Sequence, residues 1–143
     1  MFGYRITTKQ SEFDIGVIHA YLSQSYWSPG VPRNVVVKAI KNSLCFAVFD
    51  DQDKQIGFAR MITDCATFAY LADVYILETH RGQGLSKWLM GEILAHPQLQ
   101  GLRRIVLATQ DAHGLYKQFA FEPLANPQSF MELWKPDIYK DQS

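Results

Sequence analysis

Arg81, Gly82 and Gly84 belong to a short Arg-Gly-Gln-Gly stretch between a β-branched apolar run at 74–77 and an amphipathic segment that begins at Leu85. A helix that follows a strand through glycines points several unpaired backbone N–H groups at one place, with the positive end of the helix dipole behind them. The glycines let a ligand approach the backbone, and Arg81 offers a bidentate donor to phosphate. The stretch therefore predicts a pyrophosphate-binding turn, although the same glycines also suit a plain strand-to-helix turn.

Two well-known phosphate motifs do not fit this spacing. A P-loop requires Lys and Ser or Thr directly after its last glycine, whereas Leu85 and Ser86 follow Gly84. A Rossmann turn requires a third glycine where Lys87 stands. The pattern that fits is R-x-x-G-x-[GA] after a strand, with Ser86, another small residue, in the last position.

This turn resembles the acyl-CoA pyrophosphate loop of the GNAT superfamily of N-acyltransferases. A second segment, 112–121, reads AHGLYKQFAF and is similar to the family pattern A-x-x-L-Y-x-x-x-G-F, with Ala120 in place of the glycine. Thr109 stands seven residues before Tyr116, where the family often has Asn. The two motifs together identify the chain as resembling an acyl-CoA-dependent N-acetyltransferase of this superfamily.

The resemblance implies acetyl-CoA as co-substrate and Tyr116 as the family's general-acid tyrosine beside the cofactor sulfur. A phenol is a poor proton donor to a thiolate by about 2 kcal/mol, so hydrogen bonding to the sulfur is expected to matter more than full proton transfer. The residues expected to bind the cofactor, through backbone groups or side chains, are Ile76, Leu77, Arg81, Gly82, Gln83, Gly84, Leu85, Ser86 and Thr109.

Removing a proton from the acceptor is the step that needs a base. A primary amine of pKa ~10.4 is neutral in about one molecule in a few thousand at pH 7, which costs roughly 4–5 kcal/mol without help. Asp73 begins the strand that leads to the thioester and is the candidate base, directly or through a water. An ordinary strand-end carboxylate or a substrate-binding anion explains it equally well. Glu78 and His80 are weaker candidates because they adjoin the phosphates.

The acceptor side of the site is marked by an aromatic loop and an acid. Tyr26 and Trp27 lie in a Ser-, Pro- and Gly-containing loop at 24–30, which is either a pocket wall or a clamp on the first helix. Asp64 could bind a cationic substrate, and a turn-forming Asp is the commoner explanation. These residues favour a small cationic or aromatic amine over a protein tail.

The expected elements alternate as in a mixed α+β domain. Strands are expected at 4–7, 44–49, 55–62, 68–77, 103–108, 121–124 and 130–134, and helices at 12–23, 32–42, from 85 to a stop at Pro97, and 112–119. Three sequential strands with short connections predict an antiparallel meander, and the crossover after it predicts a parallel strand. The resemblance implies a GNAT fold: a mixed, mostly antiparallel sheet of six to seven strands, about four helices and a splayed parallel strand pair.

Length and composition predict one domain over residues 1–143, with a core at about 4–135 and a polar tail at 136–143. Fourteen basic and fourteen acidic residues balance without runs of like charge, so no nucleic-acid or membrane partner is expected. The start of the chain is not typical of a signal peptide, Cys45 and Cys65 have no paired pattern, and the histidines lack metal-ligand spacing. We expect a cytoplasmic protein that binds no metal. Whether it forms a homodimer through its terminal strands is a question that the sequence leaves open.

Three functions remain open from the sequence. The first is an N-acetyltransferase that moves an acetyl group from acetyl-CoA to a primary amine of a small molecule by direct attack in a ternary complex. The second is a non-catalytic acyl-CoA-binding or sensor domain, and the third is a nucleotide-binding regulatory module that uses only the anion-binding turn.

Overall fold

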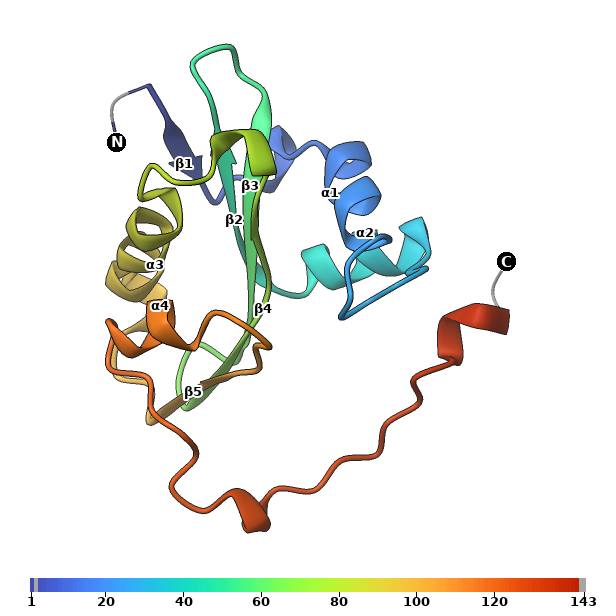
Figure 1. The fold of residues 1–143 in the computed structure, drawn as a ribbon, viewed down its shortest axis with the longest axis vertical. Helices are drawn as coiled ribbons and strands as arrows, with labels where there is room; N and C mark the ends of the chain where they lie inside the picture. The colour runs from blue at the N-terminus through green and yellow to red at the C-terminus, as the bar shows by residue number, and fades with distance from the viewer. Residues whose placement is uncertain (2, 142–143) are drawn as a thin grey trace.

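Five strands form one sheet in a computed structural model that describes residues 1 and 3–141. The strands are β1 (Arg5–Thr7), β2 (Leu44–Phe49), β3 (Gln55–Thr63), β4 (Phe68–Ile76) and β5 (Arg104–Leu107), and they lie side by side in chain order (Figure 1). Neighbours from β1 to β4 pair antiparallel, whereas β4 and β5 pair parallel. The predicted meander and parallel crossover strand are both confirmed.

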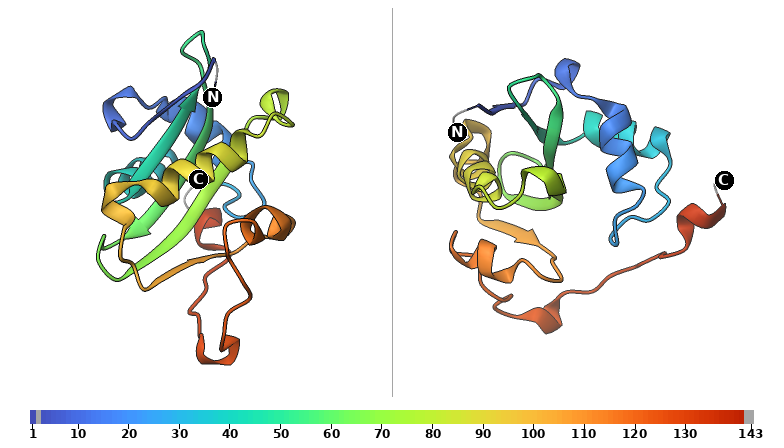
Figure 2. Two further views of the ribbon diagram at one scale, coloured as in Figure 1. Left: turned by 90° about the vertical axis from the view of Figure 1, so that its left-hand side faces the viewer. Right: turned by 45° about the horizontal axis from the view of Figure 1, so that its top comes forward.

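Helices cover both faces of this sheet. The helix α3 (Leu85–Ala95) lies on one face, and α1 (Ile15–Leu22) and α2 (Arg33–Lys41) lie on the other (Figures 1 and 2). Asp14 caps α1, because its side chain accepts the N–H of Val17. The short α4 (His113–Lys117) follows β5, and single 3-10 turns occur at Gln10–Glu12, Glu78–His80, Pro97–Leu99, Pro127–Ser129 and Ile138–Asp141.

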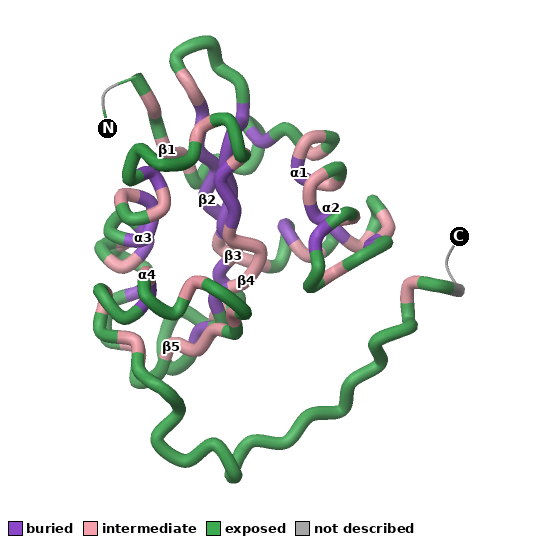
Figure 3. Tube along the Cα trace, in the orientation of Figure 1, coloured by how far each residue is buried: buried purple, intermediate pink, exposed green. Residues whose placement is uncertain are grey.

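Two apolar layers correspond to the two faces. Leu71, Leu89 and Ile93 belong to the layer under α3, while Ile18, Phe58 and Tyr75 belong to the layer under α1 and α2. Buried residues follow the strands and the inward sides of the helices (Figure 3). This two-layer packing holds the central strands rigidly from both sides, which is what a site built on β4 requires.

β4 changes its pairing halfway along its length. Its first part, through Leu71, pairs with β5, and beyond Leu107 the two strands separate. At the same point the register against β3 shifts, because two residues, Asp73 and Val74, stand opposite the single residue Ala59. Asp73 has a φ of +56°, so this is a β-bulge with its kinked residue in the left-handed region. The bulge and the split lie together and open the sheet.

Residues 122–141, here called the C-terminal arm, differ from the expectation. The strands expected at 121–124 and 130–134 are not formed among the described residues, so the sheet has five strands rather than six or seven. Residues 122–138 are all exposed, and beyond them Tyr139 is partly buried against the layer under α1 and α2. The arm runs from the β5 and α4 side round to the α1 and α2 side (Figures 1 and 2). The predicted mixed α+β class itself is confirmed.

Candidate active site

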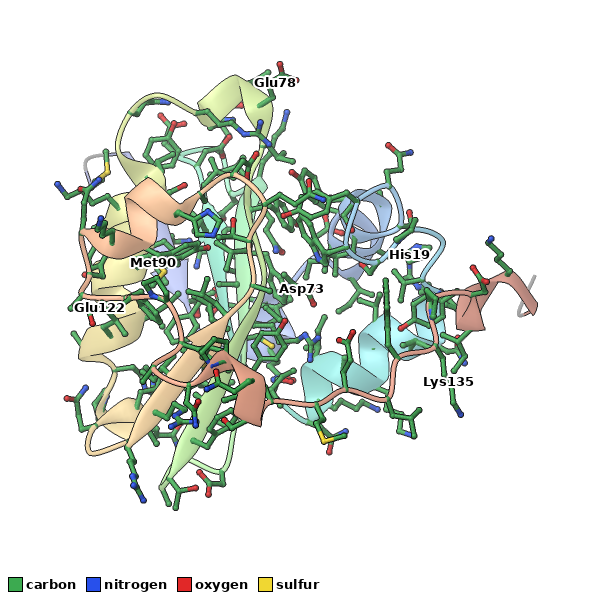
Figure 4. The ribbon with its side chains drawn as sticks, turned by 60° about the horizontal axis from the view of Figure 1, so that its bottom comes forward. His19, Asp73, Glu78, Met90, Glu122 and Lys135 are labelled. Carbon is green, nitrogen blue, oxygen red and sulfur yellow. The ribbon has the colours of Figure 1, made fainter. Side chains whose placement is uncertain are left out.

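A pocket of about 940 Å³ occupies the opening between β4 and β5. Its walls come from the second half of β4, the loop before α2, the loop between β5 and α4, and α4 itself. Asp73 lies on the side of the sheet that faces α1 and α2, and Glu78 lies at the far end of β4 (Figure 4). The pocket therefore runs along the strand edge that β5 leaves free.

One end of the pocket adjoins the start of α3. The first backbone hydrogen bond of this helix joins the N–H of Trp88 to the carbonyl of Gly84, so the N–H groups of the three residues before Trp88 have no partner within the helix. Gly82 and Gly84 both have a φ of +81°, and a Cβ added at either would meet no heavy atom within 4 Å. The turn thus presents open backbone at a helix N-terminus, as the sequence predicted.

Arg81 lies beside this turn and is held in place from two sides. Its Nε donates to the carbonyl of Ile76 at 2.8 Å, and its Nη2 donates to the hydroxyl of Tyr21 at 3.1 Å. The ring of Tyr21 stacks on Tyr75 with 3.8 Å between centroids. These contacts orient the guanidinium while leaving further N–H groups for a ligand.

Tyr21 and Tyr75 were not singled out by the sequence. Both line the pocket, and the Tyr75 hydroxyl is buried without a hydrogen-bond partner. Burial raises the pKa of Tyr75, so its hydroxyl keeps its proton. The only sequence signal was an aromatic residue within each apolar element, which is also what ordinary core packing produces.

The remaining cofactor-binding candidates divide into two groups. Ile76, Leu77, Ser86 and Thr109 line the pocket. Gln83 instead directs its side-chain amide to the Tyr4 hydroxyl and the His80 carbonyl, and the Leu85 side chain is buried in the apolar layer under α3. For these two, only backbone groups are available to a ligand at the turn.

Tyr116 reaches the pocket from α4 and is 8% exposed. Its ring packs edge-on against Phe121, with 5.9 Å between centroids. Burial raises the pKa of its phenol, and Tyr26 and Asp111 add repulsion against the phenolate. The hydroxyl therefore stays protonated at neutral pH and can donate a hydrogen bond.

Asp73 has a partner on each carboxylate oxygen. Arg60 Nε donates to Oδ2 at 2.8 Å, and the indole Nε1 of Trp27 donates to Oδ1 at 2.9 Å. Both members of the Arg60–Asp73 ion pair are largely buried. Arg60 was not predicted as a site residue, because the bulge that brings it to Asp73 depends on a single extra residue in β4. The carboxylate is thus fixed at the pocket wall and holds the aromatic loop to the sheet.

The aromatic loop closes one side of the pocket. Tyr26 and Trp27 pack edge-on at 5.1 Å between centroids, and the Tyr26 hydroxyl accepts the N–H of Gln110 at 3.2 Å. This hydrogen bond joins the loop before α2 to the loop after β5, across the opening between the strands. The loop lines the pocket and also packs on Tyr21 in α1.

Asp64 is not among the residues that line the pocket. It lies in the turn between β3 and β4, where its carboxylate accepts N–H groups from Ala66, Thr67 and Phe68 and the hydroxyl of Thr67. The Thr67 hydroxyl and these backbone donors lower the pKa of Asp64. The structure gives it the turn-forming role and does not bring it to the predicted substrate site.

Within residues 1 and 3–141, no group of three or more His, Cys, Asp or Glu side chains is arranged to hold a metal ion. No helix in the same part of the chain combines the length and the apolar character needed to cross a membrane. Cys45 is buried and Cys65 is exposed, and both are free thiols.

Comparison with known proteins identifies the family. Residues 41–123 match the family model of the acetyltransferase (GNAT) domain, which takes in β2 to α4 and the whole glycine turn. A Gibberella zeae protein named putative acetyltransferase FG08082 is 33% identical, and the match covers 79% of this chain and 75% of that protein.

Solved structures agree with this match. A crystal structure from Xanthomonas campestris, described as a putative acetyltransferase of the GNAT family, is 51% identical, covers 97% of this chain and 98% of its own, and superposes with a TM-score of 0.93. A GNAT family acetyltransferase from Elizabethkingia anophelis with acetyl-CoA bound shares the fold at 12% identity, with a TM-score of 0.67 over 94% of this chain and 90% of that one. The protein described here therefore belongs to the GNAT acetyltransferase family.

Proposed function

We propose that this protein is an N-acetyltransferase that moves an acetyl group from acetyl-CoA to a primary amine of a small molecule. One observation carries the proposal: a single pocket joins an amide-lined helix start beside Arg81 to the phenol of Tyr116, along a strand edge without a neighbour. A nucleotide-binding module would need only the first of these three features.

The residues present fit acetyl-CoA, which supplies the acetyl group as a thioester. Free N–H groups at the start of α3 and the Arg81 guanidinium suit a diphosphate, and the absence of a Cβ at Gly82 and Gly84 leaves room for it. The unpaired edge of β4 at 72–76 offers backbone groups to an amide-containing chain, as a sheet edge does to an added peptide. Ser86 and Thr109 add hydroxyls along the same wall.

Asp73 is our candidate for receiving the proton of the amine, directly or through a water. Arg60 and Trp27 each occupy one position on its oxygens and leave a second lone pair on each. Because Trp27 depends on Asp73 for its position, the carboxylate also shapes the acceptor wall. The aromatic wall and the acids Asp73, Glu78 and Asp111 favour a small cationic or aromatic amine.

The hydrogen bond between Tyr26 and Gln110 narrows the access to the pocket, which favours a small acceptor over a protein tail. Direct attack in a ternary complex then requires acceptor and thioester to lie in the pocket together, which its volume of about 940 Å³ allows. Tyr116 keeps its proton and donates a hydrogen bond to the sulfur as negative charge develops there. The free, exposed thiol of Cys65 supports a reducing compartment such as the cytoplasm.

The test is release of free thiol from acetyl-CoA with a panel of small amines, compared between the wild type and Tyr116→Phe. We expect the variant to lose about tenfold in kcat, or about 1.4 kcal/mol, with the KM for acetyl-CoA within about twofold, because its hydroxyl acts on the departing sulfur. Tyr139→Phe is the matched control and should be fully active, since Tyr139 does not line this pocket.

Binding is measured separately, through the shift in Tm that acetyl-CoA produces. Acetyl-CoA binding without thiol release by any amine would favour the non-catalytic sensor, and equal binding of ADP or ATP would favour the nucleotide module. Full activity of Tyr116→Phe with every accepted amine would rule out the role given to this phenol.

A further inference from the structure

The centre of the glycine turn has a single side chain by which the rest of the protein can hold it. In the stretch 82–84 only Gln83 carries one, because Gly82 and Gly84 flank it. Both glycines have a φ of +81°. Glycine adopts this conformation without strain, but it also has more backbone freedom to lose than any other residue. A turn of this composition therefore gains most from an anchor on Gln83.

The side-chain amide of Gln83 makes two hydrogen bonds. Its Nε2 donates to the backbone carbonyl of His80 at 3.1 Å and to the hydroxyl of Tyr4 at 3.2 Å. A carbonyl only accepts, so the amide atom that faces His80 must be the nitrogen, and both of its N–H groups are used. One bond closes the turn locally, and the other joins it to a residue 79 positions away in the sequence.

Tyr4 is itself fixed to the sheet. It directly precedes β1, which pairs with β2, and its side chain packs against the apolar layer under α3. Its hydroxyl lies 2.9 Å from Nδ1 of His80, and the two rings meet edge-on at 87° with 5.8 Å between centroids. Because the Tyr4 oxygen accepts from Gln83, its own proton can be donated to Nδ1 of a neutral His80. Tyr4 thus connects the turn to the edge of the sheet through two residues.

These contacts bear on the backbone of the turn rather than on the guanidinium beside it. Arg81 is oriented separately, by hydrogen bonds from its side chain to β4 and α1. His80 and Gln83 stand on either side of the Arg81–Gly82 pair, and the unpaired N–H groups of α3 begin directly after Gln83 and Gly84. Tyr4 is not among the residues that line the pocket, so any effect on a ligand there passes through Gln83 or His80.

We propose that Tyr4 is a positioning residue for the diphosphate of acetyl-CoA. It holds Gln83, and through Gln83 the backbone N–H groups that follow, in the conformation that binds the ligand. The inference rests on the proposed function, since it takes the glycine turn as the diphosphate site. Ordering a loose backbone opposes binding, and an anchor that orders the turn in the free protein removes that cost from the binding step.

The first experiment is calorimetric titration of acetyl-CoA into the wild type, Tyr4→Phe, Gln83→Met and the double variant. Tyr4→Phe keeps the edge-on ring packing against His80 and removes only the hydroxyl. We expect each single variant to bind about three- to tenfold more weakly, which is the range of one lost hydrogen bond. The double variant should bind no more weakly than Gln83→Met alone, because both changes break the same bond.

The matched controls for this titration are Tyr139→Phe and Gln98→Met, at positions that are not among those lining the pocket. Both should bind acetyl-CoA as the wild type does. Wild-type affinity in Tyr4→Phe, or fully additive losses in the double variant, would overturn the proposal.

Steady-state kinetics distinguishes positioning from a general loss of structure. In Tyr4→Phe the KM for acetyl-CoA should rise by the same factor as the Kd, while kcat and the KM for the amine stay within about twofold. The reason is that the change leaves Tyr116 and the acceptor wall as they are. A variant whose two KM values rise together, or whose kcat falls, would give Tyr4 a general structural role instead.

Hydrogen exchange in the free protein, followed by NMR, tests the ordering itself. The N–H of Trp88 is bonded to the Gly84 carbonyl, and that of Arg81 to the Glu78 carbonyl. Both should exchange about three- to tenfold faster in Tyr4→Phe, while N–H groups within β2 and β3 keep their wild-type rates. Unchanged exchange at these two positions would contradict the proposal.

The same experiments separate the failure of this inference from the failure of the proposed function. A wild type that does not bind acetyl-CoA would overturn both. A wild type that binds acetyl-CoA but releases no thiol with any amine would remove the catalytic function only, and the titration and the exchange rates would still decide whether Tyr4 orders the turn.

Discussion

The two halves of β4 differ in the strands that pair with them. From Phe68 to Leu71 the strand has neighbours on both sides, β3 and β5, and its inward side chains are buried. From Ala72 onward it keeps β3, gains one extra residue and loses β5. The first half is held between two strands, and the second half supplies most of the β4 residues that line the pocket.

The difference shows how one strand can serve both purposes. Backbone groups left without a sheet partner are costly unless solvent or a ligand satisfies them. In the second half that cost is offset in part by Arg81, which donates to the Ile76 carbonyl, and by the aromatic loop held through Asp73. The binding edge is therefore supported by side chains from α1, β3 and the glycine turn rather than by a neighbouring strand.

The largest expected effect is a difference in the free energy of unfolding between variants in the two halves of β4. Leu71→Ala should lower the free energy of unfolding by about 2–5 kcal/mol, because Leu71 is 3% exposed in the layer under α3 and leaves a cavity. Val74→Ala, on the same face but beyond the bulge, should cost about 1 kcal/mol, because Val74 is only partly buried. Urea denaturation of both variants gives the comparison, and equal losses would mean that the open half is packed as tightly as the paired half.

The next effect concerns catalysis at the bulge. Asp73→Asn should lower kcat/KM for the amine by about 10²-fold if the carboxylate takes the proton. Trp27→Phe removes only the indole donor to Asp73 and should cost less than about tenfold. Steady-state kinetics over a range of pH distinguishes them. Equal losses with the same pH profile would show that Asp73 acts only by holding Trp27.

The smallest expected effect concerns the glycine turn at the end of the unpaired edge of β4. Gly84→Ala should destabilise the protein by about 1–2 kcal/mol and weaken acetyl-CoA binding, because an L-residue at a φ of +81° is strained. Gly91→Ala in the same helix is the matched control and should stabilise by about 0.5–1 kcal/mol, since its Cβ would meet open space at a helical position. Calorimetric titration with acetyl-CoA and thermal unfolding measure both, and an unaltered affinity in Gly84→Ala would argue against the turn as the diphosphate site.

Local patterns predicted those parts of the fold that depend on local physics. The glycine turn at 82–84 and the meander from Leu44 to Ile76 follow from backbone freedom and alternation within a few residues. The segment 130–134 has the same apolar character as a strand, yet it pairs with no strand in the part of the chain that the structure describes. The sequence shows that such an apolar segment should be buried, but it does not show which surface buries it.

For the site too, sequence predicted the residues that belong to local motifs and missed those that depend on strand register. Tyr116 and Arg81 follow from motifs of fixed spacing, and both line the pocket. The ion pair of Arg60 with Asp73 depends on one residue of register between two strands, a quantity that no local pattern carries. Asp64 was ambiguous for a related reason, because a carboxylate that caps its own turn and one that binds a ligand have the same local sequence.

The bulge at Asp73 also constrains how the chain length can vary. Side chains 69 and 71 point to α3 before it, and 74 and 76 do so after it, because the bulge takes one residue out of the alternation. Removing that residue would restore regular alternation and lose the bulge at Asp73, whereas adding one residue would send Tyr75 into the α3 layer and turn Ile76 outward. Related chains should therefore show insertions and deletions in the Asp50–Lys54 hairpin turn but none between Ala72 and Ile76. At this point in the fold, residue count is as strict a requirement as residue type.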